Sequence, residues 1–253
     1  MPYKQGLLKI IEKKKLTIDV YLMTIEGNEA KYVSASGQFI NIKINDSKEP
    51  YLRRPMSIYD YSSTTITFIF KVVGEGTKIL SKKEIGESLD CLIGLGNGFK
   101  ENEYNNILLI GGGLGTPPMY SLAKKLKAKG KTVNCVLGFG SKNDVILENE
   151  YKNVCDNVYV ASMDGSIGTK GTVIDCIKEN NIKFDYYYSC GPEKMLDALV
   201  INYPDNGELS FEARMGCGFG ACMGCSCKVK TKPYKRICVE GPVLSSKEVI
   251  VND

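Results

Sequence analysis

Four cysteines near the C-terminus have a spacing that could hold a redox-active iron centre. Cys217, Cys222, Cys225 and Cys238 follow the pattern Cys-x4-Cys-x2-Cys-x12-Cys. Thiolates at this spacing are typical of a [2Fe-2S] centre, in which four cysteines hold two irons. The first three lie in the run MGCGFGACMGC, whose glycines let the backbone wrap tightly and point its amides inward at a cluster. We therefore predict that these four cysteines are the metal ligands and that the chain transfers electrons.

A structural zinc site and a group of non-ligating thiols are the alternatives for this segment. Structural zinc prefers two close cysteine pairs set far apart, whereas here the distant end contributes the single Cys238. Cys227 has no place in the four-ligand spacing, so we expect it to pack and not to ligate. The other five cysteines stand singly in apolar or helical contexts, and we expect small core residues. They are Cys91, Cys135, Cys155, Cys176 and Cys190.

The composition excludes several classes of function. The 253 residues are 43% hydrophobic and 25% charged, which suits one large or two ordinary domains. No apolar run reaches the roughly 18 residues that would span a membrane, and the start MPYKQGLLKIIEKKK lacks a signal-peptide core, so we expect a cytoplasmic protein with reduced thiols. A net charge of +4 with dispersed lysines is no nucleic-acid footprint. The absence of histidine excludes Rieske-type ligation and Ser-His or Cys-His nucleophiles.

The chain changes character twice, which predicts three parts. Short β-type runs separated by Gly, Asn, Asp and Ser turns fill residues 1–101 and predict a small antiparallel β-barrel. Residues 102–208 alternate buried strands with helices, starting from the strand Ile107 to Ile110, and predict a parallel α/β sheet of the nucleotide-binding kind. Residues 209–253 form the glycine- and cysteine-rich [2Fe-2S] module.

Two short motifs in the barrel region could bind a phosphate or a flavin. LRRPMSIYD places Arg54 and Ser57 in or beside a strand, and a guanidinium fork can hold pyrophosphate oxygens in pairs. GEGTKIL delivers Thr77 to the start of a short helix, where backbone amides attract anions. Each motif has an ordinary alternative. The first could be a surface Arg-Arg pair, and the second could be a turn in which Thr77 caps a helix. Their joint occurrence ahead of a nucleotide-type sheet favours binding.

Two turns of the α/β region could bind a nucleotide. GGGLGTPP follows a buried strand and opens a helix with Pro117 and Pro118 in its first turn, so its amides could cradle phosphates. The sequence does not match G-x-G-x-x-G, and no acidic residue closes the next strand, so the dinucleotide fingerprint is not met. Cys190-Gly191-Pro192 opens another helix at the same expected sheet edge.

These motifs together resemble the ferredoxin reductase superfamily. In that family an Arg-x-Tyr-Ser motif, the following strand and a Gly-Thr turn bind FAD, and here Met56 replaces the usual tyrosine. FEARMGCGFGACMGCSC and MDGSIGTKGTV look more specifically like the electron-transfer subunits of dihydroorotate dehydrogenase B. Carried over, the resemblance implies FAD contacts from Arg54, Pro55, Met56, Ser57, Ile69, Phe70, Lys71, Gly76 and Thr77. It implies nicotinamide-nucleotide contacts from Gly111, Gly112, Gly113, Gly115, Thr116, Cys190, Gly191 and Pro192.

The resemblance also implies an activity and a partner. A flavin can connect NAD, which exchanges two electrons at once, to a cluster that takes one. In the family, electrons run from the FMN of a separate dihydroorotate dehydrogenase B catalytic subunit through [2Fe-2S] and FAD to NAD+ during pyrimidine biosynthesis. The two subunits assemble as a heterotetramer with two copies of each. This chain would then lack a dihydroorotate site, and its cofactors would carry the chemistry without a catalytic side chain.

Two rival functions remain. One is the small flavoprotein subunit of a bifurcating NADH-dependent ferredoxin:NADP oxidoreductase, a group in which Asp stands as the first ligand where this chain has Cys217. The other is a non-enzymatic nucleotide sensor with a structural four-cysteine zinc site. An absorption spectrum separates the second from a flavin and iron–sulfur protein, because zinc gives no colour.

Overall fold

The first hundred residues close into a six-stranded antiparallel barrel, as predicted. The computed structural model describes residues 3–45 and 49–251. The barrel strands are joined in the order β1-β2-β5-β4-β3-β6. Their bounds are β1 (Lys4–Lys15), β2 (Val20–Glu26), β3 (Phe39–Lys43), β4 (Arg54–Tyr61), β5 (Thr65–Lys71) and β6 (Ser88–Leu95). A 3-10 turn, η1 (Asn28–Tyr32), follows β2, and helix α1 (Glu75–Lys82) follows β5.

Alternating apolar residues fill the barrel. Ile66, Phe68 and Phe70 of β5 point inward and are buried, and Leu80 of α1 joins the same core. Strand β1 carries no such obvious signal, because the lysines that fill its sequence point outward while Leu8 and Ile10 alone are fully buried. Strand β1 therefore has one face buried in the barrel and one face exposed to solvent.

The second body is a seven-stranded sheet in the order β10-β9-β8-β7-β11-β12-β15. Its pairs are parallel except that of β12 with β15, which is antiparallel. The strands are β7 (Asn106–Gly112), β8 (Thr132–Phe139), β9 (Asn157–Ser162), β10 (Thr169–Lys170), β11 (Tyr186–Cys190), β12 (Gly207–Ser210) and β15 (Val243–Ser245). The helices are α2 (Tyr120–Ala128), α3 (Glu148–Lys152), α4 (Val173–Glu179) and α5 (Glu193–Asn202). Short 3-10 turns are η2 (Gly113–Gly115), η3 (Pro117–Met119), η4 (Lys142–Asp144) and η5 (Ser246–Glu248).

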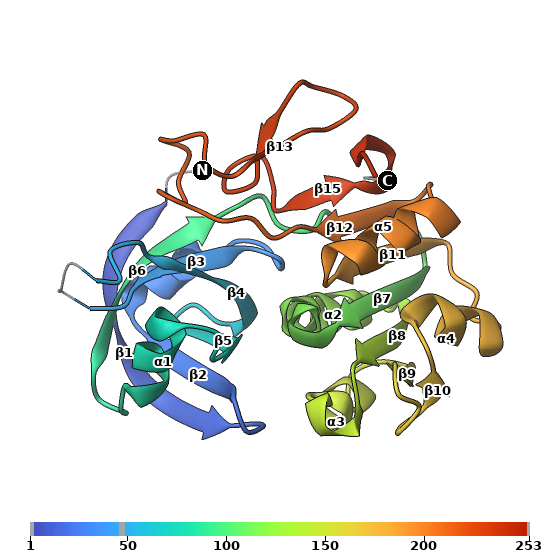
Figure 1. The fold of residues 1–253 in the computed structure, drawn as a ribbon, viewed down its shortest axis with the longest axis horizontal. Coiled ribbons are helices and arrows are strands. Elements are labelled where there is room, and N and C mark those ends of the chain that lie inside the picture. The colour runs from blue at the N-terminus through green and yellow to red at the C-terminus, as the bar shows by residue number, and fades with distance from the viewer. Residues whose placement is uncertain (1–2, 46–48, 252–253) are drawn as a thin grey trace.

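Helices cover both faces of this sheet because successive residues of the central strand point to opposite sides. Ile107 and Leu109 of β7 pack with α2 and α3, whereas Leu108 and Ile110 pack with α4 and α5. All four residues are fully buried, which explains why this strand reads as a continuous apolar run. The prediction of a parallel sheet with helices on both faces is confirmed (Figure 1). The antiparallel edge strand β15 was not expected.

The barrel and the sheet meet along helix α2. Tyr59 on the outer face of β4 stacks on Tyr120 at the start of α2, with ring centroids 4.6 Å apart and planes 17° apart. Val20 and Ile69, also on the outer face of the barrel, belong to the same apolar cluster as the buried side of α2. Asp60 adds an ion pair to Lys124 at 2.5 Å. The two bodies therefore share one apolar seam.

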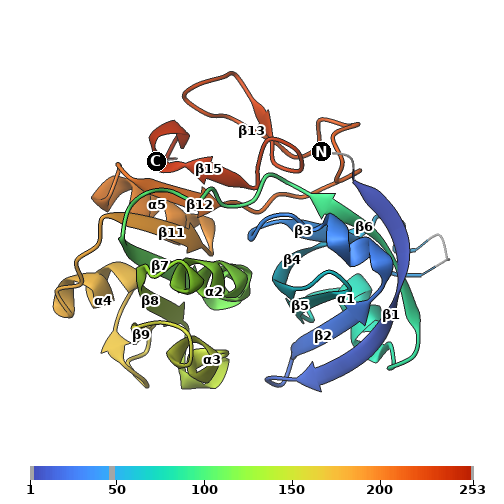
Figure 2. The ribbon, with the colours of Figure 1, turned by 180° about the vertical axis from the view of Figure 1, so that it is seen from behind.

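The C-terminal segment crosses above both bodies (Figures 1 and 2). It leaves the sheet through β12, forms a two-stranded hairpin of β13 (Ser226–Cys227) and β14 (Lys235–Arg236), and returns to the sheet as β15. The predicted boundary between residues 208 and 209 thus lies within β12. Val229 adds a bridge to Val249.

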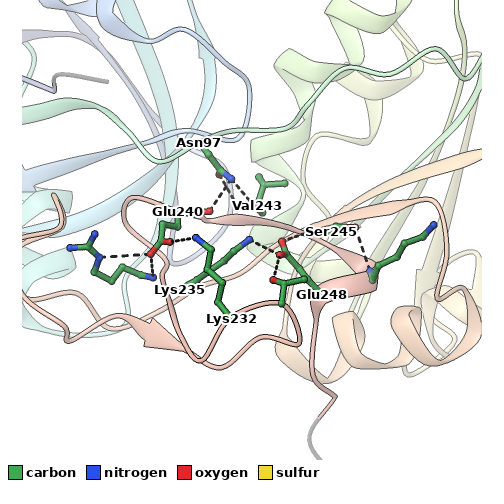
Figure 3. A network of polar contacts seen from close by, with 10 residues as sticks. Asn97, Lys232, Lys235, Glu240, Val243, Ser245 and Glu248 are labelled. Atoms are coloured by element: carbon green, nitrogen blue, oxygen red, sulfur yellow. Dashed lines mark hydrogen bonds and ion pairs between the residues drawn. The ribbon is translucent and has the colours of Figure 1, made fainter.

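Asn97, in the connection from barrel to sheet, holds the end of this segment. Its amide donates to the carbonyls of Glu240 and Val243 at 3.2 and 2.8 Å and accepts the Val243 N–H at 3.1 Å. Figure 3 shows Glu240 also reaching Lys232, and Glu248 reaching Lys235. This polar network ties the hairpin, the barrel exit and the sheet edge together. No helix among residues 3–45 and 49–251 is long and apolar enough to cross a membrane.

Glu208 of β12 is a buried carboxyl that also holds the barrel-to-sheet connection. It accepts the Lys100 N–H at 2.8 Å, and the neighbouring Lys100 carbonyl accepts the Tyr188 hydroxyl at 2.6 Å. Burial raises the pKa of Glu208 to about 7, although the hydrogen bond and charge of Lys100 oppose that shift. The folded state therefore favours the protonated carboxyl.

We expect Glu208→Gln to remove part of the pH dependence of folding. Because the folded pKa lies above the unfolded one, the stabilising effect of the protonated carboxyl is present below the unfolded pKa and lost as pH rises through about 7. Glutamine keeps an acceptor for Lys100 and has no charge, so the variant should gain roughly 1 to 3 kcal/mol over the parent near pH 8 and about nothing near pH 4. Denaturant unfolding at both pH values measures this. The exposed Glu101→Gln is the control, and equal curves for Glu208→Gln and the parent would contradict the assignment.

Candidate functional site

The four predicted ligand cysteines lie together in the C-terminal segment, in two pairs. Cys225 and Cys238 are buried with their sulfurs 3.2 Å apart. The Cys222 N–H donates to the Cys217 sulfur at 3.4 Å. A [2Fe-2S] centre needs two thiolates on each iron, so two pairs of thiols fit it. Among the described residues, no group of three or more Cys, His, Asp or Glu is arranged to hold a single metal ion.

The loop from Gly216 to Cys222 points its backbone amides at a thiol. Burial by itself would raise the pKa of Cys217, but the amides of Cys222, Phe219 and Ala221 point at its sulfur and lower the pKa to about 6. Gly218 and Gly220 make this wrap possible, since their φ angles of 78° and 92° lie in the left-handed region. The loop therefore stabilises a thiolate at Cys217, the form that binds metal.

Cys227 differs from the four. It is half-buried on β13 and packs against the apolar cluster that contains Cys225 and Cys238, and burial raises the pKa of its thiol. The five scattered cysteines are all buried, as expected of core residues, and all ten cysteines are free thiols.

Two further polar atoms near the cysteines are buried and lack partners. They are Oδ1 of Asn41, on barrel strand β3, and Oγ of Ser226, between Cys225 and Cys227. The Ser226 hydroxyl can donate a hydrogen bond to a sulfur, so its lack of a partner fits a loop shaped around an iron–sulfur cluster. Asn41 Oδ1 can only accept, so a sulfur does not satisfy it. The residues present thus fit an iron–sulfur cluster.

Arg54 lies against the start of helix α1. A side-chain Cβ at Gly76 would lie 2.6 Å from Arg54 Nε, so only glycine lets the guanidinium pack here. The amides of the first turn of α1 have no partner within the helix and attract anions, as does the guanidinium. Arg54 also donates to the Leu52 carbonyl. Together these groups form a cationic site at one end of the barrel.

Thr77 supports that site from within the helix. Its hydroxyl accepts the amides of Val73 and Gly74 at 2.9 and 3.2 Å and donates to the Gly74 carbonyl at 3.0 Å. The alternative reading made Thr77 the N-cap, but Gly74 is the N-cap and Thr77 stands three residues later. Its hydroxyl therefore fixes the turn that presents the helix amides.

The remaining predicted FAD residues divide between the two faces of the barrel. Met56 and Phe70 are buried in the barrel core, and Ile69 is buried in the seam with α2. Pro55 and Ser57 alternate with Met56 and are half-exposed on the outer face. Lys71 is exposed at the end of β5 and pairs with Asp19 at 3.3 Å.

The two predicted nucleotide turns lie in contact at the carboxyl edge of the sheet. A Cβ at Gly115 would lie 2.1 Å from the Cys190 carbonyl oxygen and 2.5 Å from the Gly191 nitrogen. Gly112 has somewhat more room, since its ideal Cβ position lies 2.6 Å from Sδ of the Met195 side chain. Glycine is therefore required where the first turn crosses the second. The Cys190 side chain is buried, so only its backbone reaches this edge.

A cavity of about 570 Å³ opens at this edge, between sheet and barrel. Gly112, Gly113 and Pro192 line it, whereas Gly111, Gly115, Thr116, Cys190 and Gly191 support the turns behind. Barrel residues Asp19 and Lys71 line the opposite side. A cavity of this size, with apolar walls and few polar groups, suits a cofactor.

Sequence reasoning missed much of the cavity wall. Phe139 ends β8, and Asp144 and Met163 follow β8 and β9. Thr172 precedes α4, and Lys194 lies in the first turn of α5. All five lie near the carboxyl ends of parallel strands or the starts of helices, so the rule that open α/β sheets bind ligands at their carboxyl edge could have found them. Asp144 is an acidic residue shortly after strand β8, and no sequence fingerprint identified it.

The architecture matches known reductases. The structure of an NADH-dependent reduced ferredoxin-NADP oxidoreductase, solved to study flavin-based electron bifurcation, superposes with a TM-score of 0.86 at 30% identity, covering 97% of this chain and 90% of that one. A ferredoxin NADP+ reductase from Neisseria gonorrhoeae shares the fold, with a TM-score of 0.69 at 18% identity over 83% of this chain and 95% of that one. Fold and site thus define a ferredoxin-reductase-like protein with an iron–sulfur module.

Sequence relatives identify the family to which this chain belongs within the reductases. The family model described as the iron-sulfur cluster binding domain of dihydroorotate dehydrogenase B matches residues 212–250. The dihydroorotate dehydrogenase B (NAD(+)), electron transfer subunit, of Fusobacterium nucleatum is 44% identical over 248 residues, which are 94% of this chain and 95% of that protein. The chain belongs to the family of dihydroorotate dehydrogenase B electron transfer subunits.

We expect Cys227→Ala to keep its iron and Cys238→Ala to lose it. Cys238 pairs with Cys225 at 3.2 Å, whereas Cys227 lies outside both pairs. Iron and sulfide content, with visible absorbance, measures the difference. Loss of the cluster from Cys227→Ala together with retention in Cys238→Ala would overturn the ligand set.

We expect Arg54→Ala to weaken FAD retention by about one to two orders of magnitude, because a charge-assisted contact is worth roughly 1.5 to 3 kcal/mol. Flavin content after extensive dialysis measures this. Lys78→Ala, which removes an exposed cation from helix α1 next to Arg54, is the matched control. Equal flavin loss from both variants would count against a specific role for Arg54.

Proposed function

We propose that this chain carries electrons from a dihydroorotate-oxidising partner to NAD+. FAD, NAD and an iron–sulfur cluster are its cofactors, and the cysteine ligands and nucleotide residues named above are the proposed contacts. The observation that carries the proposal is the adjacency of three sites in one chain: a cationic barrel end, a cavity at the sheet edge and a four-thiol loop.

The arrangement suits transfer in sequence. Phe39, Leu92 and Leu95 on the outer face of the barrel belong to the same apolar cluster as Cys225 and Cys238. Pro55 and Ser57 also lie on this outer face. They belong to β4, which pairs with the strand β3 that carries Phe39. A flavin held there would have the thiols on one side and the nucleotide cavity on the other. The flavin supplies the exchange between one-electron and two-electron carriers, while the protein sets their order.

The partner in this proposal is the FMN-containing catalytic subunit of dihydroorotate dehydrogenase B. The segment around the cysteines carries exposed apolar side chains, which suit docking of another protein. They are Phe219, Met223, Tyr234 and Val239. Docking there would bring the partner's flavin to the cluster. We propose two copies of each subunit in the assembly.

We also propose that the protein works in the cytoplasm, in pyrimidine biosynthesis. The ten free thiols suit a reducing compartment.

The bifurcating reductase remains a second candidate, because its structure matches at a TM-score of 0.86. The fold does not separate the two functions. The relative from Fusobacterium nucleatum shares 44% of aligned residues against 30% for that reductase, and this favours the dihydroorotate pathway.

The test is a reconstitution with the purified chain. Alone, it should pass electrons from NADH to artificial acceptors without oxidising dihydroorotate, because the barrel, the sheet and the cysteine segment take up the described residues 3–45 and 49–251. Adding the FMN subunit should create dihydroorotate:NAD+ activity, and cluster removal should abolish that coupling while sparing NADH turnover at FAD. Dihydroorotate oxidation by this chain alone would sink the proposal, and NADPH–ferredoxin chemistry without binding of the FMN subunit would favour the bifurcating reductase.

A further inference from the structure

Asn41 stands in the middle of strand β3, between the proposed flavin strand and the cysteine loop. Its neighbours Ile40 and Ile42 point into the barrel core, so the Asn41 side chain points to the outer face. It lies directly opposite Pro55 of β4 on one side and Leu92 of β6 on the other. Only 1% of Asn41 is exposed. The position of a fully buried amide on this outer face calls for an explanation.

The amide nitrogen contacts the cysteine loop. Asn41 Nδ2 donates to the Cys217 carbonyl at 3.2 Å, and this is the hydrogen bond by which the side chain reaches the loop. A carbonyl only accepts, so the contact orients the amide with its nitrogen toward Cys217. Gly218 permits the approach, since a Cβ there would lie 2.3 Å from Asn41 Nδ2.

Arg53 fixes the backbone of strand β3 at Asn41. Arg53 donates to the Asn41 carbonyl at 3.3 Å and to the Asp90 carboxylate at 2.9 and 3.0 Å. These contacts tie β3 to β6 directly beside Arg54 of the proposed flavin site. Cys217 is therefore connected to the flavin strand through one side chain and a rigid barrel wall.

The amide oxygen has no partner although it is buried. An unpaired buried acceptor costs roughly 1 to 3 kcal/mol, whereas a typical hydrogen bond contributes about 1 kcal/mol. Asn41 therefore brings no net stability to the fold. The contact with the Cys217 carbonyl is then the interaction that gives this buried amide a role.

We propose that Asn41 is a positioning residue for the cluster. It fixes Cys217, the first thiolate ligand, relative to the flavin strand, and its amide dipole sets the electrostatic environment of the iron that Cys217 binds. The inference rests on the proposed function, because it presupposes a loaded cluster and flavin.

Two substitutions separate this role from a structural one. Asn41→Leu has nearly the same size and removes both the hydrogen bond and the unpaired oxygen, so its unfolding midpoint should stay close to that of the parent. Asn41→Asp also loses the donor and adds a negative charge beside the cluster. Asn45→Leu is the matched control, since Asn45 likewise has a buried unpaired Oδ1 but its amide contacts the Glu49 carbonyl, away from the cysteines.

The experiment uses the full chain loaded with FAD and cluster. Redox titration followed by EPR gives the midpoint potential and spectrum of the cluster, and rapid mixing with NADH gives the rate of flavin-to-cluster transfer. We expect both Asn41 variants to change the spectrum and to slow transfer. We also expect them to retain the cluster about fivefold to tenfold less well on dialysis, because one hydrogen bond is lost. The potential should fall further in Asn41→Asp than in Asn41→Leu, and Asn45→Leu should match the parent.

The outcomes are distinct. Loss of the cluster from the Asn41 variants but not from Asn45→Leu would also support positioning by Asn41. Parent-like potentials, spectra and rates in both Asn41 variants would overturn the inference while leaving the proposed function intact. A parent chain that binds no iron–sulfur cluster would instead defeat the proposed function itself.

Discussion

The apolar seam between barrel and helix α2 is the contact on which the other sites depend. Tyr59 stacked on Tyr120, with Val20 and Ile69 beside them, fixes the barrel against the sheet. Lys71 and Asp19 of the barrel face the glycine turns across the cavity at this junction. The C-terminal segment spans the same junction from above, so it too requires both bodies in fixed relation. Electron transfer between carriers needs such fixed spacing, and apolar packing supplies it without directional bonds.

Polar contacts then select one arrangement of the C-terminal segment. Asn97 donates to and accepts from the backbone near Val243, and Glu240 and Glu248 collect the lysines of the hairpin (Figure 3). The Lys232–Glu240 pair is partly exposed and contributes little stability, whereas the Lys235–Glu248 pair is largely buried. These ion pairs matter because they hold the segment in one orientation. A loop rich in glycine has many accessible conformations, and its ligands must all point to one place. The network and the return of β15 to the sheet confine it.

Glycine has two separate roles in this protein. At Gly112 and Gly115 it lets two turns cross at contact distance, which builds the floor of the cavity. At Gly218 and Gly220 it supplies left-handed backbone, which turns the amides of the loop toward the Cys217 sulfur. The first role concerns space and the second concerns conformation. A larger residue would fail at the two places for different reasons.

The sequence alone determined the local chemistry: the cysteine spacing, the buried strand Ile107 to Ile110, the glycine turns and the barrel-then-sheet order all depend on residues near one another in the chain. It also identified Arg54 and the Gly-Thr turn as two separate motifs, without revealing that Gly76 is the surface on which the guanidinium packs. Strand β1 escaped notice because its pattern makes sense only once six strands close and two inward residues suffice. The cavity walls at Asp144 and Met163, the antiparallel strand β15 and the contact of Asn41 with Cys217 join residues far apart in sequence. Only tertiary packing could decide those contacts, because no local propensity specifies which distant segments meet.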